Sequence, residues 1–204
     1  MTHVDQWITS RHAFYRVGCE QCHGGNPKTS DERAAHRGVV NSANSSSPVH
    51  RMALPLTCGR CHRSEVSAFE LSVHRELLSQ GDTQAPTCTS CHTSMATEVP
   101  LPAALESQCL HCHHDDPQNR ARVARRQIED LARLRSSLRR AKFEINTTKD
   151  TDRQTALTKQ WTDADLSLRN AAAGIHAFNQ ERVDDRLSDA RRQVERLAAA
   201  LARR

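Results

Sequence analysis

The sequence predicts a mainly α-helical protein in two parts, and three observations lead to this prediction. The C-terminal part repeats apolar residues at three- and four-residue steps, which is the pattern of amphipathic helices. The composition changes at Asp116 and Pro117, a pair typical of a helix start. The part before it is polar, rich in turn formers, and contains four copies of a C-x-x-C-H motif. We expect a motif-bearing domain with little regular structure over residues 1–115, followed by a long antiparallel helical hairpin over residues 116–204.

The four C-x-x-C-H motifs contain all eight cysteines of the 204-residue chain. Two thiols at this spacing can each form a thioether to one vinyl group of a haem, and the adjacent histidine can bind the iron. The sequence therefore predicts four covalently attached c-type haems. The cysteines are Cys19, Cys22, Cys58, Cys61, Cys88, Cys91, Cys109 and Cys112, and the motif histidines are His23, His62, His92 and His113.

Three other uses of these cysteines explain the pattern less well. Two zinc sites of four thiolates each would use the cysteine pairs but would not need a histidine after every pair. Iron–sulfur clusters use different cysteine runs, which this sequence does not contain. A disulfide framework suits an even number of cysteines in an exported chain, but it does not require histidine at a fixed position.

Composition agrees with a cofactor-dependent fold. Aromatic residues make up 3% of the chain and hydrophobic residues 37%, which is low for a protein that must bury a core. The first 115 residues are too polar to fold on their own, and four apolar porphyrins would supply the missing core. We expect this region to be largely unfolded without haem.

The net charge of +5 is unevenly distributed. Residues 1–114 contain 9 lysines and arginines against 10 acidic residues, whereas residues 115–204 contain 20 against 14. Some of the C-terminal basic residues can cover haem propionates or meet an acidic partner, while a solvated helix surface explains most of the arginines equally well. Because basic and acidic residues are interleaved and no nucleic-acid motif is present, we expect no nucleic-acid binding.

No hydrophobic run has the length of a membrane span, and the first residues lack a signal-peptide pattern. Haem attachment to C-x-x-C-H takes place outside the bacterial cytoplasm, so we expect a periplasmic or other extracytoplasmic protein. This requires that an export leader or N-terminal membrane anchor was removed ahead of residue 1.

Several shorter elements are expected within the two parts. A short helix precedes the first motif, a helix over residues 64–80 is capped by Ser64, and residues 93–108 are mostly loop. In the C-terminal part, one helix starts at Asp116 and a second covers residues 151–201, with a bend or stutter at residues 178–183.

A sixth ligand for each iron decides between a carrier and a catalyst. The chain has twelve histidines, and eight remain after the four motif histidines are subtracted. Met52 and Met95 are the only plausible sulfur ligands, so bis-histidine ligation is the more economical interpretation. We expect His111, which lies inside the fourth motif, to point away from the haem, and His3 to be mobile. His114 directly follows a motif histidine, so it can reach only the haem of a different motif. The predicted sixth ligands are His12, His50, His74 and His176, with His36 as the alternative to His50.

The motif sequences, the segment from Ser72 to His92 and the tail around His176 resemble multihaem cytochromes c of bacterial respiratory chains. These are similar in haem packing to pentahaem nitrite reductase and octahaem hydroxylamine oxidoreductase. The resemblance implies a multihaem cytochrome c fold, in which a C-terminal helix returns a histidine to the haem core. The enzymes' own signatures are missing: no motif histidine is replaced by lysine, and Tyr15, the only tyrosine, lies far from the end of the haem region.

The resemblance therefore implies electron transfer between respiratory redox partners, such as a quinol-oxidising membrane subunit and a terminal reductase. A small reductase of nitrogen or sulfur oxyanions, acting at one open haem, is the first alternative. The second is a homo-oligomer, in which chains stack into a conductive filament.

Overall fold

The computed structural model describes residues 2–203, in which all regular structure is helical. This confirms the prediction of a mainly α-helical fold with long helices in the C-terminal part. The chain divides into two compact units, residues 1–101 and residues 102–204.

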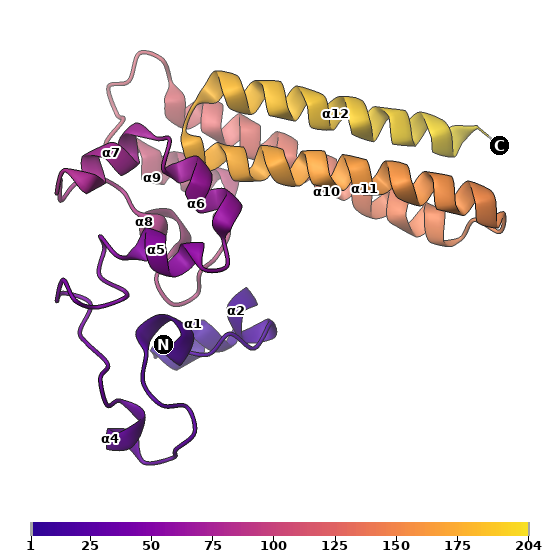
Figure 1. The fold of residues 1–204 in the computed structure, drawn as a ribbon. Coiled ribbons are helices and arrows are strands. Elements are labelled where there is room, and N and C mark those ends of the chain that lie inside the picture. Colours follow the sequence, from indigo (N-terminus) through magenta and orange to yellow (C-terminus); the bar gives the residue numbers. More distant parts are fainter. Residues whose placement is uncertain (1, 204) are drawn as a thin grey trace. The chain divides into compact units, whose positions relative to one another are not determined.

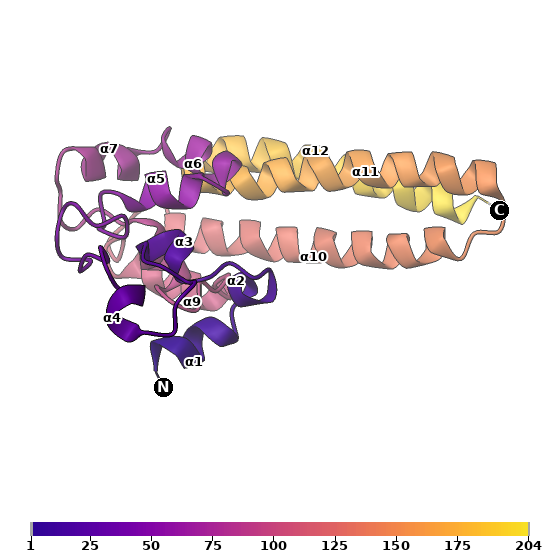
Figure 2. The ribbon, with the colours of Figure 1, turned by 60° about the horizontal axis from the view of Figure 1, so that its bottom comes forward.

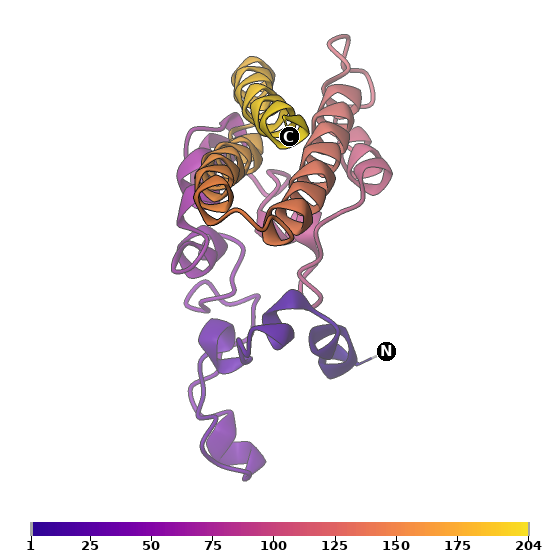
Figure 3. The same ribbon diagram turned by 90° about the vertical axis from the view of Figure 1, so that its right-hand side faces the viewer.

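The second unit is built on three long helices, α10 (Arg120–Asn146), α11 (Thr151–Gly174) and α12 (Gln180–Ala202). Successive helices run in opposite directions (Figure 1), and a view along the bundle shows the three arranged around a shared axis (Figure 3). The register of α10 and α11 is fixed in part by Trp161, whose Nε1 donates to the Leu138 carbonyl oxygen at 2.9 Å.

One apolar core fills the space between the three helices. It consists of apolar residues that follow the three- and four-residue steps of the sequence and so share one face of each helix. The buried members are Leu131, Leu134, Leu138, Ala141, Ile145, Leu157, Ala164, Leu168, Ala171, Val183, Leu187, Ala190, Val194 and Leu197.

The prediction of one helix over residues 151–201 with a bend at residues 178–183 is wrong in one respect, since the chain reverses direction there. Helix α11 ends at Gly174, the short 3-10 helix η1 (Ile175–Ala177) follows, and Phe178 adopts a left-handed φ of 52°. A straight continuation would leave the apolar face of α12 in water, whereas the reversal buries that face against α10 and α11.

The first long helix begins later than predicted. Asp116 and Pro117 precede it, and α10 starts at Arg120 after Asn119, which has a left-handed φ of 51°. The Asp116 carboxylate accepts the Arg120 backbone N–H at 2.8 Å, so Asp116 still satisfies a donor at the helix start from outside the helix.

Helix α9 (Pro102–Leu110) corrects the prediction of a loop over residues 93–108. Proline is favoured in the first turn of a helix, and the residues that follow it are good helix formers. Glu106 of α9 forms an ion pair of 2.8 Å with Arg125 of α10. The boundary between the two units along the chain therefore lies between residues 101 and 102, not at residue 115. The fourth C-x-x-C-H motif belongs to the helical unit.

The first unit consists of short helices joined by turns (Figure 2). Most have fewer than two turns and obtain little stability from their own hydrogen bonds. They are α1 (His3–Ile8), α2 (Arg11–Phe14), α3 (Glu20–His23), α4 (Glu32–Ala35), α5 (Leu54–Gly59), α6 (Arg63–Phe69), α7 (Val73–Ser79) and α8 (Cys88–His92).

The predicted helix over residues 64–80 is two helices, α6 and α7. The break lies at Ser72, whose buried hydroxyl accepts the Arg75 backbone N–H at 3.1 Å and so caps a new helix. Val73 is exposed and Leu78 is fully buried, so the apolar stripe does not continue from α6 into α7 as predicted.

The first unit has a small protein core. Five hydrophobic side chains are buried in residues 2–101, against seventeen in residues 102–203. Large hydrophobic side chains show the opposite distribution, since ten are exposed in the first range and four in the second. The buried cluster of the first unit is formed by Phe69, Leu78 and Ala85.

Candidate functional site

Each C-x-x-C-H motif is folded as a helical turn. In the first, second and fourth motifs the carbonyl oxygen of the first cysteine accepts the N–H of the second cysteine at 3.2 Å and that of the histidine at 2.8 or 2.9 Å. The third motif is itself helix α8. Residues i, i+3 and i+4 of a helix lie on one face, so both thiols and the imidazole project to the same side. Two thioethers and one axial nitrogen for a single haem require this arrangement.

No disulfide joins any two of the eight cysteines, and none of them is fully buried. Partial burial raises the pKa of Cys109 in the second unit, which keeps it in the neutral thiol form near pH 7.

Thiols from the first three motifs lie close to one another within the first unit. A hydrogen bond between the Cys58 and Cys88 side chains raises the pKa of Cys58 and lowers the pKa of Cys88. Cys22 of the first motif also interacts with Cys58, and burial raises the pKa of Cys22. The Arg60 guanidinium, inside the second motif, donates to the carbonyl oxygen of Gln21, inside the first. The fold thus brings three C-x-x-C-H motifs from distant segments into one cluster.

The third motif histidine has a partner suited to a metal ligand. Nδ1 of His92 lies 2.9 Å from the Glu98 carbonyl oxygen. A carbonyl oxygen can only accept a hydrogen, so Nδ1 donates and Nε2 is the nitrogen left for a metal. Histidines that bind metals are commonly oriented by such a backbone carbonyl.

His12, a predicted sixth ligand, lies against a motif histidine. The ring centroids of His12 and His62 are 5.9 Å apart, with an angle of 57° between the ring planes. Nδ1 of His12 lies 3.0 Å from the Thr97 hydroxyl oxygen. Burial, and next to it the proximity of His62, lower the pKa of His12, so its imidazole is neutral near pH 7, as iron binding requires.

The two candidates for a fourth distal ligand differ in their hydrogen bonds. Nδ1 of exposed His36 lies 2.8 Å from the Glu32 carbonyl oxygen, which leaves Nε2 for a metal. Nδ1 of His50 instead accepts the Met52 backbone N–H at 3.3 Å, so the hydrogen of a neutral imidazole is on Nε2. His36 is therefore the better prepared of the two.

The remaining predicted ligands lie in different units. His176 is in η1, where its Nδ1 lies 3.1 Å from the Ala173 carbonyl oxygen and Nε2 is again left for a metal. His74 is half-buried in α7, two residues after the Ser72 cap.

The other histidines are on the surface. His3 is exposed in α1, His111 donates from Nδ1 to the Ser107 carbonyl oxygen at 2.8 Å, and His114 lies 3.1 Å from the Asp115 carboxylate.

Thr97 is the residue at this site that the sequence analysis did not identify. It lies in a segment without regular structure, and it has a left-handed φ of 45°, which is uncommon for a β-branched residue. Its contact with His12 joins segments 85 positions apart in the chain, so no local pattern could have revealed it.

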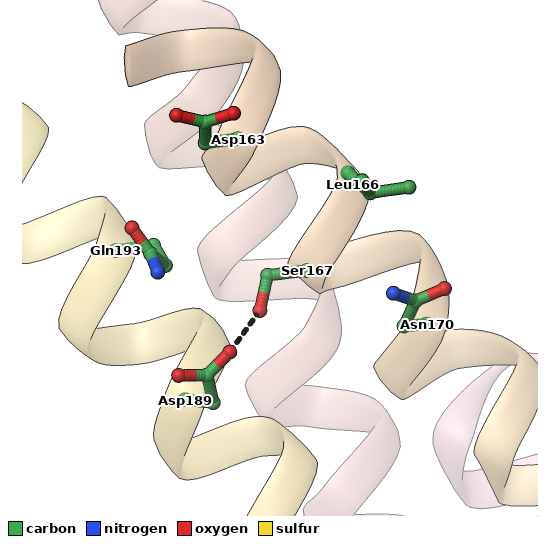
Figure 4. A pocket seen from close by; sticks show the side chains of 6 residues that line it. All are labelled: Asp163, Leu166, Ser167, Asn170, Asp189 and Gln193. Atoms are coloured by element: carbon green, nitrogen blue, oxygen red, sulfur yellow. Dashed lines mark hydrogen bonds between the residues drawn. The ribbon is translucent and has the colours of Figure 1, made fainter.

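A polar groove on the second unit, between α11 and α12, is unlike a haem site. Figure 4 shows Ser167 of α11 donating to the Asp189 carboxylate of α12, and the bond length is 2.7 Å. Three of the other lining side chains are polar as well, namely Asp163, Asn170 and Gln193, and the fourth is Leu166. An apolar porphyrin face would find few partners here.

The residues of the first unit fit c-type haem by two observations. Each motif presents two free thiols and an imidazole from one helical turn, which is the donor set that haem attachment needs. The unit also exposes large apolar side chains while burying few, so it offers apolar contact surface to flat cofactors.

Within residues 2–203, no three histidine, cysteine, aspartate or glutamate side chains are grouped so that they could hold a metal ion, although a bis-histidine haem iron takes only two such ligands. None of the helices described is long and apolar enough to cross a membrane. No family model, curated protein or solved structure matches the chain.

Proposed function

We propose that this chain is a tetrahaem c-type cytochrome, which transfers electrons between respiratory redox partners through bis-histidine haems. When bound, haem supplies iron that alternates between the ferric and ferrous states. The motif cysteines would hold each porphyrin, the motif histidines would bind its iron, and the predicted distal histidines would exclude other ligands from it.

The observation that carries the proposal is the conformation of the four motifs. All four are helical turns with two free thiols and an imidazole on one face, and three of them are clustered in the first unit. Electron transfer needs cofactors held close together, and neighbouring attachment sites provide this without a substrate pocket.

The histidine inventory favours a carrier over a catalyst. Four sixth ligands are needed, and the chain offers His12, His36, His74 and His176. The pKa of His12 is lowered, Nδ1 of His36 and of His176 each lies against a backbone carbonyl oxygen, and His74 lies in helix α7. The proposal includes an extracytoplasmic location and redox protein partners, such as a quinol-oxidising membrane subunit or a terminal reductase.

The test is to produce the chain behind an export leader in a host that matures c-type cytochromes. We expect four covalently bound haems by intact mass and pyridine haemochrome absorbance, and four low-spin ferric irons by EPR. The matched variant Cys88→Ser/Cys91→Ser should carry three haems, because the third motif then has no thiols.

A folded and colourless protein, or one that binds zinc in place of haem, would contradict the proposal. Four haems with one high-spin iron that binds carbon monoxide after reduction would support the small oxyanion reductase instead. Long polymers in electron micrographs of the purified protein would support the conductive filament.

A further inference from the structure

We propose that His12 is the sixth ligand of the iron bound by His62, and that Thr97 holds it in position. This assigns a distal histidine to a particular haem, the one attached at Cys58 and Cys61, and it rests on the proposed function.

The spacing of the two imidazoles is the first argument. Their ring centroids are 5.9 Å apart. A metal–nitrogen bond of about 2.0 to 2.1 Å on each side, with roughly 1.1 Å from each nitrogen to its ring centre, gives about 6.2 to 6.4 Å between the centroids of an axial pair. The separation of His12 and His62 is therefore within about half an ångström of the one that an iron between them would impose.

The hydrogen bonds of Thr97 are the second argument. Its hydroxyl donates to the Ala96 carbonyl oxygen at 2.8 Å, and the same oxygen lies 3.0 Å from Nδ1 of His12. A hydroxyl has one hydrogen, so once it is given to Ala96 the oxygen accepts the Nδ1–H of His12. The lone pair of the neutral imidazole is then on Nε2, the nitrogen that remains for iron.

The local scaffold gives His12 a defined position. Ser10 is buried and its hydroxyl accepts the Ala13 backbone N–H at 3.1 Å, which caps helix α2 at its first residue, Arg11. After the helix, the His12 carbonyl oxygen accepts the Val17 N–H at 2.8 Å. The Trp7 indole donates to the Val17 carbonyl oxygen at 3.0 Å, which ties α1 to the same turn.

The conformation of Thr97 agrees with a positioning role. Left-handed backbone is unfavourable for a β-branched residue, and such strain is found at functional sites where the surrounding structure maintains it.

If His12 occupies the sixth position, the second haem has no open coordination site. It then exchanges electrons and does not bind substrate.

The test compares EPR spectra of the ferric holoprotein and of His12→Ala. The variant should keep four haems and show one new high-spin iron, which imidazole added to the buffer returns to low spin. The exposed His3→Ala serves as the control and should leave all irons low-spin.

A second background assigns the signal to one haem. Cys58→Ser/Cys61→Ser removes the second haem, so His12→Ala in this three-haem protein should add no high-spin iron. A new high-spin signal in that background would overturn the assignment, because His12 would then serve another haem. An unchanged spectrum of His12→Ala with four haems present would overturn it as well, while the proposed function would stand.

Two further variants cover the case in which His12→Ala does not mature. His12→Met retains a ligand and should raise the midpoint potential of one haem, because methionine ligation raises haem potentials. Thr97→Val keeps the side-chain shape but cannot accept the Nδ1–H, so the same haem should remain low-spin and shift to higher potential. Unaltered potentials in both variants would contradict the proposal, and absence of covalent haem in the parent protein would contradict the proposed function itself.

Discussion

Single polar side chains set local features of the bundle that its apolar pattern does not. Gln127 lies among the buried residues of α10, and its amide donates to the Gln180 carbonyl oxygen at 3.0 Å and to the Asp184 carboxylate at 2.9 Å. Because a buried amide without partners is costly, these bonds favour one register of α10 against α12. Ser167 and Asp189 form a similar link between α11 and α12 on the surface.

The Ser167 hydroxyl should control the titration of Asp189. Its hydrogen bond lowers the pKa of Asp189 below the usual value of 3.8, because it stabilises the charged form. A carboxylate with a lowered folded-state pKa contributes stability above its unfolded pKa, and that stability is lost as the pH falls through the folded value. In Ser167→Ala the pKa of Asp189 should rise. The measurement is an NMR titration of the carboxyl carbon from about pH 2 to about pH 6, which spans the usual pKa of an aspartate.

The control for this titration is Ser136→Ala on the exposed face of α10, which should leave the pKa of Asp189 unchanged. Equal values for Asp189 in the parent protein and Ser167→Ala would show that the hydrogen bond does not determine the titration.

At the scale of elements, N-cap side chains mark where two of the three long helices begin. Asp150 accepts the Arg153 backbone N–H at 3.0 Å at the start of α11, and Asn179 accepts the Arg182 N–H at 3.0 Å at the start of α12. The second cap follows Phe178 in left-handed conformation, so the reversal is encoded within a few residues. Without a cap, the first N–H groups of a helix lack partners.

Replacing the α12 cap should weaken the bundle. Asn179→Ala removes the acceptor, and we expect it to lower the free energy of unfolding by about 1 kcal/mol in a urea titration followed by circular dichroism. Asn146→Ala makes the same chemical change at the exposed end of α10 and should cost less than half as much. A loss at Asn146 equal to that at Asn179 would show that capping is not the cause.

At the scale of the whole molecule, the two units differ in what stabilises them. The helical unit has a core of its own, whereas the first unit buries three side chains in its main cluster and exposes ten large hydrophobic ones. Apolar burial is the main favourable contribution to folding, so the first unit obtains less of it from its own side chains than the helical unit does, and under the proposed function haem would supply the rest.

The two units should therefore respond differently to the absence of haem. Residues 102–204 with Cys109→Ser and Cys112→Ser should unfold cooperatively in urea, with a slope of about 1 to 3 kcal/mol/M. Residues 1–101 produced without haem should show no cooperative transition by the same measurement. A cooperative transition in haem-free residues 1–101 would show that protein contacts suffice there.

Much of the architecture follows from local patterns. The apolar steps from Leu131 to Leu197 predict long helices, because a helix with one apolar face must bury it. The prediction failed where two signals competed. At Ser72 a cap divides the predicted helix, at Pro102 a helix begins within the predicted loop, and near Phe178 the predicted bend is a reversal of the chain.

The sequence by itself determined the four attachment motifs, since cysteine and histidine spacing within one helical turn is a local property. It also determined the helical nature of the C-terminal part, because periodicity needs no partner to be recognised. Only the tertiary structure decided that three motifs share one cluster, that α12 folds back on α10 and α11, and that His12 lies between Thr97 and His62. These features join residues far apart in the chain, and such contacts depend on how every intervening turn directs the backbone.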